Sequence, residues 1–175
     1  MKRILNRLFP AQFDNTYRGN RLALWLFYPL TAATLWRSQH HIFAPDGGAQ
    51  SIATIPLDAY TQGGAQSVVT IFALWGLAQL AMGLVMLLAA IRYKSMIPLL
   101  WLFILLEYGG RKLVGIYKPL ETIGTAPGAT AATILPIIAA LMLVLALWPE
   151  RDRANSRATR AHANMQVGPA TKPAI

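Results

Sequence analysis

Long apolar segments separated by short polar ones form the main pattern of the sequence. The clearest apolar segment, 67–91, runs for 25 residues without a charge. Three more occupy 20–40, 96–117 and 130–148. A helix needs about 20 mostly apolar residues to cross the hydrocarbon core of a bilayer. The pattern therefore predicts an all-α protein, an integral membrane four-helix bundle whose transmembrane domain occupies residues 20–148.

The first of these segments is the shortest. Its apolar part, 22–36, lies between Arg21 and Arg37. Arginine side chains can extend toward the membrane surface, so residues 20–40 can still cross as a helix. A cleaved signal peptide shows a similar pattern. We favour a retained helix, because the charged region before it is long and no small-residue cleavage site follows Trp36.

Basic segments flank the four predicted helices at both ends of the chain. In the N-terminal segment, 1–19, apolar residues recur at helical spacing up to Pro10. Either a short amphipathic helix at the membrane surface or a disordered basic tail fits this pattern. The C-terminal segment, 149–175, carries five basic residues and no periodic apolar face. We expect it to be a disordered cytoplasmic tail.

Charge is scarce and unevenly placed. Charged residues make up 13% of the chain, about half the usual share in soluble domains, and the net charge is +9. If four spans alternate sides, the terminal segments and the turn at 92–95 share one side of the membrane. That side holds twelve basic and three acidic residues. The other side holds four basic and four acidic residues. A basic excess marks the cytoplasmic side. We therefore expect cytoplasmic N- and C-termini, a multi-pass protein of the bacterial inner (plasma) membrane, and no nucleic-acid partner.

Small residues repeat along one face of the second predicted span. Gly76, Gly83 and Ala90 recur every seven residues, and Gln79 lies on the same face. Small residues let a neighbouring helix approach closely, and a polar side chain among them can form a hydrogen bond across the contact. We therefore predict a helix-packing face that includes Gly76, Gln79 and Gly83.

The third predicted span carries an acid and a base at membrane depth. Glu107 lies about 16 Å into the span, near the bilayer centre, where an unpaired charge is costly. Arg111 follows four residues later on the same face, so we expect the two side chains to pair. The pair is either a structural device that fixes the helix register or part of a polar site in which Arg111 holds an anionic or carbonyl oxygen.

Residues at the outer end of the first span extend this candidate site. Arg37 is expected at a depth similar to that of Arg111, and His40 shares the helix face of Arg37. The candidate ligand-binding residues are therefore Glu107, Arg111, Arg37 and His40. The adjacent His41 points about 100° away from His40, and no HxxxH pattern occurs, so we expect no metal site.

Signatures of catalysis do not occur in the sequence. There is no cysteine, which excludes thiolate chemistry, and there is no GxSxG, phosphate-binding loop, GxGxxG or HExxH motif. We predict no catalytic residues and no cofactor. The sequence does not decide whether the protein is an enzyme, but the absence of these motifs favours a protein that is not one.

The order of these parts resembles a known kind of protein. A loop with Pro and Gly, 43–48, follows the first span, the second span contains Trp75-Gly76 and Met82-Gly83, and the third ends in EYGGR at 107–111. In this order the chain resembles small, uncharacterised bacterial inner-membrane proteins of the broad DoxX-like, four-helix kind. The resemblance covers residues 20–148 and implies a compact four-helix membrane bundle, but it implies no catalytic residue.

The sequence therefore favours a non-enzymatic membrane protein, either an accessory subunit or a binder of a lipid or quinone-like small molecule. Its expected partners are membrane lipids and either a second copy of the chain or a larger membrane complex. One alternative is a small transporter or permeation subunit that uses Glu107 as a proton or cation relay. Another is a membrane enzyme acting on a hydrophobic substrate.

Overall fold

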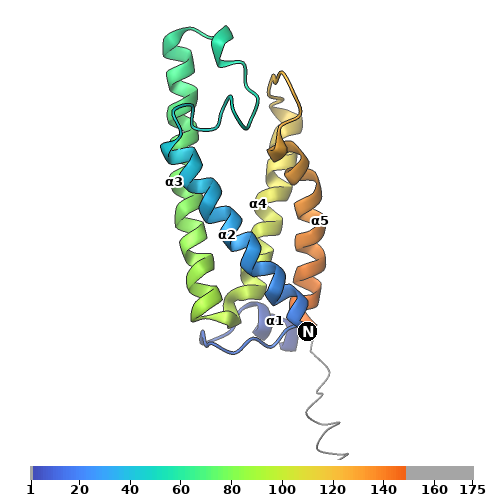
Figure 1. Ribbon diagram of the computed structural model, residues 1–175. Coiled ribbons are helices and arrows are strands. Elements are labelled where there is room, and N and C mark those ends of the chain that lie inside the picture. Colours follow the sequence, from blue (N-terminus) through green and yellow to red (C-terminus); the bar gives the residue numbers. More distant parts are fainter. Residues whose placement is uncertain (1, 149–175) are drawn as a thin grey trace, which may run out of the picture.

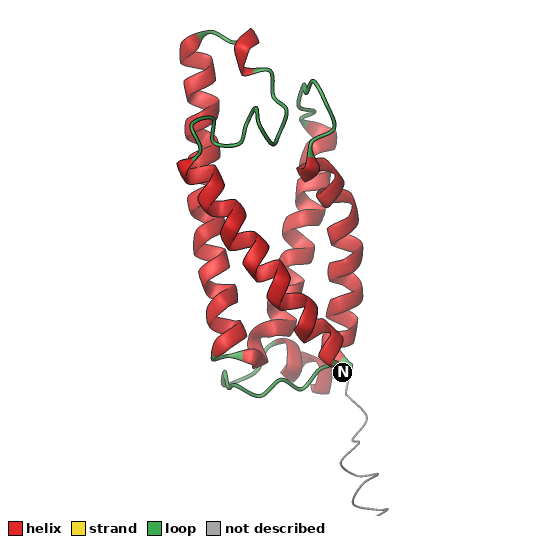
Figure 2. Ribbon diagram, viewed as in Figure 1, coloured by secondary structure: helices red, strands yellow, loops and turns green. Residues whose placement is uncertain are grey.

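A computed structural model describes residues 2–148 of the chain. Every regular element within this range is a helix, which confirms the predicted all-α class. The tail predicted at 149–175 lies outside the described residues. The elements follow one another in this order (Figures 1 and 2): α1 Lys2–Leu8, α2 Arg21–Phe43, the 3-10 turn η1 Leu57–Ala59, α3 Gln62–Ile91, the 3-10 turn η2 Lys94–Met96, α4 Ile97–Tyr117 and α5 Pro127–Leu147.

Side-chain caps fix where two of the long helices begin. The side chain of Asn20 accepts a hydrogen bond from the Leu22 N–H (2.9 Å), and that of Thr61 accepts one from the Gly64 N–H (3.2 Å). The cap at Thr61 starts α3 at Gln62, five residues before the predicted start. The first turn of α3 is polar, so it does not carry the apolar signal on which that prediction was based.

Two other helices also extend past their predicted ranges. α2 continues to Phe43, three residues further than predicted, and the Ala44 N–H closes its last turn on the His40 carbonyl (2.9 Å). α5 begins three residues early, at Pro127, where a proline is well tolerated because the first N–H groups of a helix have no partner within it.

The four long helices form two close pairs. α2 packs along α3, and α4 packs along α5. α2 runs diagonally across the bundle, so that it starts beside the end of α5 and finishes beside α3 (Figure 1). α3 and α4 make few contacts although a short turn joins them. The bundle is therefore loosely packed between α3 and α4.

One end of the bundle, which we call the closed end, is covered by α1, the turn between α3 and α4, and residues 9–20, the N-terminal strap. The Asp14 N–H donates to the Ser95 hydroxyl (2.8 Å), and the Ser95 N–H donates to the Asp14 carbonyl (3.2 Å). The Asn20 N–H donates to the Leu145 carbonyl near the end of α5 (3.0 Å). These bonds place the N-terminal segment, the end of α5 and the turn at 92–96 on the same side of the molecule.

The opposite end, which we call the loop end, carries the loops 44–61 and 118–126. They touch each other, because the Ile123 N–H donates to the Thr54 carbonyl (3.0 Å). The Asp46 carboxylate orders the first loop by accepting from the backbone N–H groups of Gly48 and Ser51. Burial raises the pKa of this carboxyl, but the N–H donors of Ser51 and Gly48 outweigh burial and lower the pKa to about 2.

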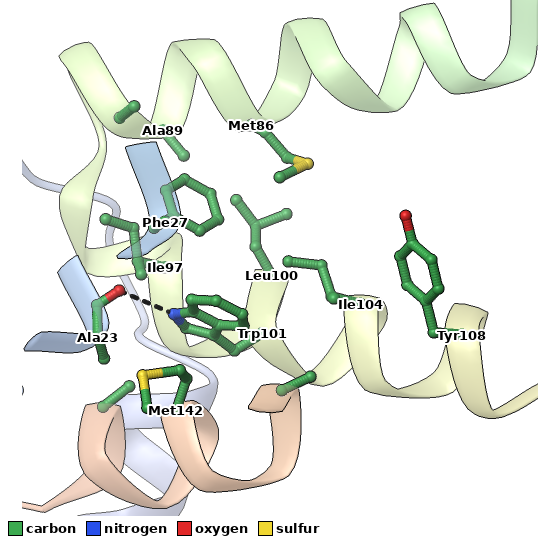
Figure 3. Packing of buried hydrophobic residues seen from close by; sticks show 13 residues of the cluster. Ala23, Phe27, Met86, Ala89, Ile97, Leu100, Trp101, Ile104, Tyr108 and Met142 are labelled. Atoms are coloured by element: carbon green, nitrogen blue, oxygen red, sulfur yellow. Dashed lines mark hydrogen bonds between the residues drawn. The ribbon is translucent and has the colours of Figure 1, made fainter. Parts of the chain in front are cut away.

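The main core lies in the half of the bundle near the closed end (Figure 3). Trp101 is buried at its centre, and its ring packs edge-on against Phe27 with 5.9 Å between ring centres. The indole Nε1–H of Trp101 donates to the Ala23 carbonyl on α2 (3.1 Å). Met86 of α3 and Met142 of α5 belong to the same cluster, so all four long helices contribute to it.

Much of the apolar surface of the long helices lies outside this core. α3 and α5 are long and apolar enough to cross a membrane, and only 22% of the most apolar 18-residue stretch of each is buried. Large apolar side chains such as Trp25 on α2 and Leu106 on α4 are also exposed. α2 and α4 do not meet the same measure of length and apolar composition, and the crossing of a membrane by any of the four long helices stays a prediction.

Candidate functional site

Two arginines from different helices converge on the same pair of aromatic rings in the half of the bundle near the loop end. The guanidinium carbon of Arg111 lies 4.6 Å from the ring centre of Trp75 on α3 and 4.9 Å from that of Tyr108 on α4. The guanidinium carbon of Arg37 on α2 lies 6.0 and 5.7 Å from the same two centres. The electron-rich faces of the rings attract both cations. We call these four side chains the arginine cluster.

A buried glutamine links the arginine cluster to α3. The Arg37 Nε–H donates to Oε1 of Gln79 (2.9 Å), and Gln79 is only 4% exposed. Because an arginine nitrogen can only donate, this bond identifies the oxygen of the amide and so also its nitrogen. The amide nitrogen Nε2 of Gln79 is buried and has no hydrogen-bond partner among the described residues. Such a donor normally has a partner, so one is missing here.

The predicted ion pair between Glu107 and Arg111 forms within α4. One oxygen of the Glu107 carboxylate accepts from the Arg111 guanidinium one helical turn later. The side chain of Arg111 is 22% exposed and that of Glu107 is 40% exposed, so the pair is not sealed inside packed protein. The arginine cluster with Glu107 therefore contains two positive charges and one negative charge.

A cavity of about 310 Å³ lies between α3 and α4, and it shares Trp75 with the arginine cluster. Its lining is mostly apolar, and its volume is at the lower end of the usual range for small-molecule sites. Met82 and Phe103 line it and are also exposed on the outside of the bundle, so the cavity opens sideways. The lining residues are Trp75, Ala78, Gln79, Met82 and Met86 from α3 and Leu100, Phe103, Ile104 and Glu107 from α4.

The two ends of this cavity differ in chemistry. At the end nearer the loops, Gln79 and Glu107 are polar, and Trp75 joins the cavity to the arginine cluster. Toward the closed end the walls consist of methionine and aliphatic or aromatic side chains, ending at Met86 and Leu100. Measured along the helix axis, Trp75 to Met86 spans about 16 Å. The site is thus an apolar groove with a polar end, where Gln79 and Glu107 line the cavity and the arginines lie directly behind them, bonded to these two side chains.

The structure does not bring His40 into this arrangement. The imidazole of His40 stacks on Trp36, with 5.9 Å between ring centres. It is His41, one residue later, that is buried against Trp75, with 4.8 Å between ring centres. Its Nδ1 lies 2.7 Å from the Gly47 carbonyl, so a hydrogen bond connects the loop 44–61 to the site. Of the four candidate residues, Glu107, Arg111 and Arg37 come together and His40 does not.

Sequence reasoning missed the aromatic part of the site. Trp75 and Tyr108 are not among the candidate residues that the sequence indicates, yet their rings contact both guanidinium groups. The signal for Tyr108 was present, because it follows Glu107 directly and precedes Arg111 by three residues. The signal for Trp75 was its position about one helical turn before Gln79. Neither spacing indicates by itself that α3 and α4 place the two rings around the same cations.

The glycines of α3 face α2 at the side of the site. A Cβ atom added at Gly76 would lie 2.7 Å from Cβ of His41 and 3.0 Å from the Ser38 carbonyl oxygen. One added at Gly83 would lie 2.8 Å from Cδ2 of Leu35. The close approach of α2 to α3 therefore needs glycine at Gly76, whereas at Gly83 the end of the Leu35 side chain would have to shift. This approach places Arg37 beside Gln79.

A larger hollow of about 480 Å³ lies at the closed end, beneath the N-terminal strap. Its three cationic side chains already have partners: Arg7 donates to the Leu147 carbonyl, Lys94 donates to the Asn15 side chain, and Arg18 pairs with Asp14. The hydrogen bond from Arg18 lowers the pKa of the Asp14 carboxyl. The cations of this hollow are already held by neighbouring groups, so the cavity at the arginine cluster is the better candidate.

No group of three or more His, Asp or Glu side chains that could hold a metal ion occurs within residues 2–148. The chain matches no protein-family model, no curated protein and no solved structure. These comparisons do not bear on the DoxX-like resemblance, which stays an expectation. The function must therefore be argued from the cavity and the arginine cluster themselves.

Proposed function

We propose that this protein is an integral membrane protein of the bacterial inner membrane that binds a lipid or quinone-like small molecule without transforming it. In this proposal α2, α3, α4 and α5 all cross the membrane and both termini are cytoplasmic. The observation that carries the proposal is the cavity between α3 and α4, which is apolar along its length and polar at one end. A molecule with a hydrocarbon part and a polar part fits such a cavity.

Length and charge support the membrane part of the proposal. α2 and α4 have 23 and 21 residues, which gives about 35 and 32 Å of helix, enough for a hydrocarbon core of about 30 Å. Their charged residues Arg37, Glu107 and Arg111 cluster with one another and with aromatic rings. Charged groups within membranes are usually gathered in this way. The basic turn at 92–95 and the basic N-terminal segment lie at the same end of the bundle.

Reporter fusions test the topology. A fluorescent reporter that folds only in the cytoplasm should be active when fused to either terminus, and a periplasm-dependent alkaline phosphatase should be active when inserted in the loops 44–61 or 118–126. Opposite locations for the two termini would contradict the proposal. A chain that stays soluble and monomeric without detergent would contradict it as well.

Ligand binding tests the cavity. We suggest adding hexadecanoate, hexadecanol and a short-chain ubiquinone analogue, each separately, to the full chain in a mild neutral detergent, and counting bound molecules by native mass spectrometry. At least one probe should bind saturably at one site per chain. Ala78→Trp, which fills the cavity, should abolish this binding. The matched control is Ala81→Trp, because Ala81 is exposed on the same helix but does not line the cavity.

The arrangement around Glu107 gives transport and catalysis less support. Its carboxylate is held by Arg111 on the same helix, so a proton relay through Glu107 would have to break this pair in every cycle. A binding site needs no such step. Co-purification in mild detergent would identify the larger complex or second copy expected of an accessory subunit.

A further inference from the structure

We propose that the ligand of this cavity is a monoanionic amphiphile with one hydrocarbon chain, a long-chain carboxylate, whose head group binds at the arginine cluster and whose chain lies between α3 and α4. This proposal rests on the proposed function and names the class of molecule that fills the site. Four features support it: the excess charge, the unpartnered donor, the shape of the groove and its orientation.

The charges at the polar end are not balanced. Glu107 pairs with Arg111, but Arg37 forms no ion pair with any residue in the described part of the chain. Arg37 is only partly exposed and its hydrogen-bond partner is the neutral side chain of Gln79. A partly buried charge without a counter-charge is unfavourable in a low-dielectric region. One added negative charge would neutralise the site, whereas a neutral head group would leave Arg37 uncompensated.

The free hydrogen-bonding groups at this end are donors. The guanidinium of Arg37 carries further N–H groups besides the Nε–H bound to Gln79, and the Gln79 amide nitrogen lacks a partner among residues 2–148. A carboxylate offers only acceptors and matches the planar fork of a guanidinium. Gln79 lines the cavity, so an acceptor bound there would reach its amide nitrogen once the side chains that cover it move.

The remainder of the cavity suits a single hydrocarbon chain. Its walls beyond Gln79 and Glu107 are apolar, and the α3 side runs about 16 Å from Trp75 to Met86. Met82 and Met86 are flexible and polarisable side chains that adapt to a chain of varying shape. The cavity is a single groove of about 310 Å³ between one pair of helices, so we assign it one hydrocarbon chain.

The orientation of the groove matches an amphiphile of the outer leaflet. Counted along α4 from its start at Ile97, Arg111 lies about 21 Å from the closed end, within the outer half of a hydrocarbon core of about 30 Å. The apolar end of the groove, at Met86 and Leu100, points toward the closed end. A head group at the arginine cluster would therefore face outward and its chain would point inward, and the sideways opening would admit it from the membrane.

The experiment compares two probes that share a chain and differ in charge. Binding of hexadecanoate and of hexadecanol to the full chain is measured in a neutral maltoside detergent near pH 8. The wild type should bind hexadecanoate at least about tenfold more tightly than hexadecanol. Arg37→Gln should remove this preference while it retains the binding of hexadecanol, which also shows that the variant is folded. Arg92→Gln is the matched control, because Arg92 is a cation at the closed end, beside Tyr93, and should leave the preference unchanged.

Each other result overturns a defined part of the account. Equal affinities for the two probes in the wild type, both lost in Ala78→Trp, would overturn the anionic ligand but leave the proposed function intact. Binding of neither probe, nor of the quinone analogue, would overturn both. A single phosphatidylglycerol molecule that displaces hexadecanoate and binds more tightly would overturn the single-chain carboxylate. Loss of the preference for hexadecanoate in Arg92→Gln would show that it depends on general surface charge and not on the arginine cluster. This result would also overturn the proposal.

Discussion

The two halves of the bundle use the same helices in different ways. Near the closed end, α2, α3, α4 and α5 all contribute to a core around Trp101 (Figure 3). There the N-terminal strap is also bonded to the turn between α3 and α4. Near the loop end, α3 and α4 leave a cavity between them, and charged side chains lie against aromatic rings. One half is built from close packing and the other from separated helices with unsatisfied polar groups.

The difference separates the packing that stabilises the bundle from the cavity that we propose as a binding site. In a membrane, helix association depends on close packing and interhelical hydrogen bonds, because lipid tails are as apolar as the side chains. The half around Trp101 supplies that packing, and the glycines of α3 extend it along α2. α3 and α4 can therefore remain apart at the arginine cluster without loss of the fold. Changes in the two halves should have different consequences.

The largest expected effect is on stability, from Trp101→Ala. The substitution removes a fully buried ring and its hydrogen bond to the Ala23 carbonyl, so we expect a loss of about 3 kcal/mol or more. Thermal unfolding in detergent, followed by circular dichroism, would measure it. Trp25→Ala is the control, because Trp25 is 66% exposed and should cost much less. Similar losses in the two variants would show that the core near the closed end has no special role.

A smaller loss of stability is expected from Gly76→Ala. The added Cβ would contact Cβ of His41 and the Ser38 carbonyl, so α2 and α3 must move apart, at a cost of about 1–3 kcal/mol. The movement should also weaken hexadecanoate binding, because Arg37 and Gln79 lie across this contact. Gly109→Ala is the matched control, since its Cβ would meet no atom within 4 Å. Alanine favours the helix, so this control should be neutral or slightly stabilising.

Glu107→Gln should change ligand binding more than stability. Removal of the carboxylate frees Arg111 and adds one unit of positive charge to the site, so the affinity for hexadecanoate should rise about threefold. Affinity for hexadecanol should not change. The control is Glu121→Gln, which alters an exposed carboxylate in the loop 118–126. If the ion pair only fixes the helix register, Glu107→Gln will leave both affinities where they are.

The smallest expected effect is local and depends on pH. The pKa of Asp46 is lowered to about 2 by backbone N–H donors, so its contribution to the order of loop 44–61 is complete above its ordinary pKa of 3.8. That contribution should be lost as the pH falls from about 4 toward about 2. The Gly48 and Ser51 amide resonances should report this transition in the wild type, and Asp46→Ala should lack it. A carboxyl titration near pH 4 would contradict the hydrogen-bonding pattern.

Sequence alone predicted the helical class, the rough extent of four long helices and the pairing of Glu107 with Arg111. These follow from local rules, because apolar length and the four-residue spacing act within one helix. The start of α3 depends on the cap at Thr61. The first turn of α3 is polar, so it lies outside the apolar segment from which the helix was predicted. Helix ends of this kind are set by one or two side chains and are hard to place from hydropathy.

The parts of the site that were missed depend on how helices are rotated against each other. His40 and His41 differ by about 100° around α2, and the sequence does not indicate which of them faces α3. In the structure the contact at Gly76 turns His41 inward, against Trp75, and leaves His40 on Trp36. The convergence of Arg37 and Arg111 on Trp75 and Tyr108 needs three helices in place at once, so no spacing within one helix encodes it.

The hydrogen bonds from α1 and the N-terminal strap to α5 have a consequence for the order in which the fold is completed. Arg7 donates to the Leu147 carbonyl (3.1 Å), and the Asn20 N–H donates to the Leu145 carbonyl (3.0 Å). Ribosomes make the first partner of each bond well before the second, which belongs to the final turn of α5. Arg7 and Asn20 must therefore remain without these two partners until the last helix has been synthesised. Fastening of the strap is then a late step of biogenesis, and it marks a chain whose helices are all in place.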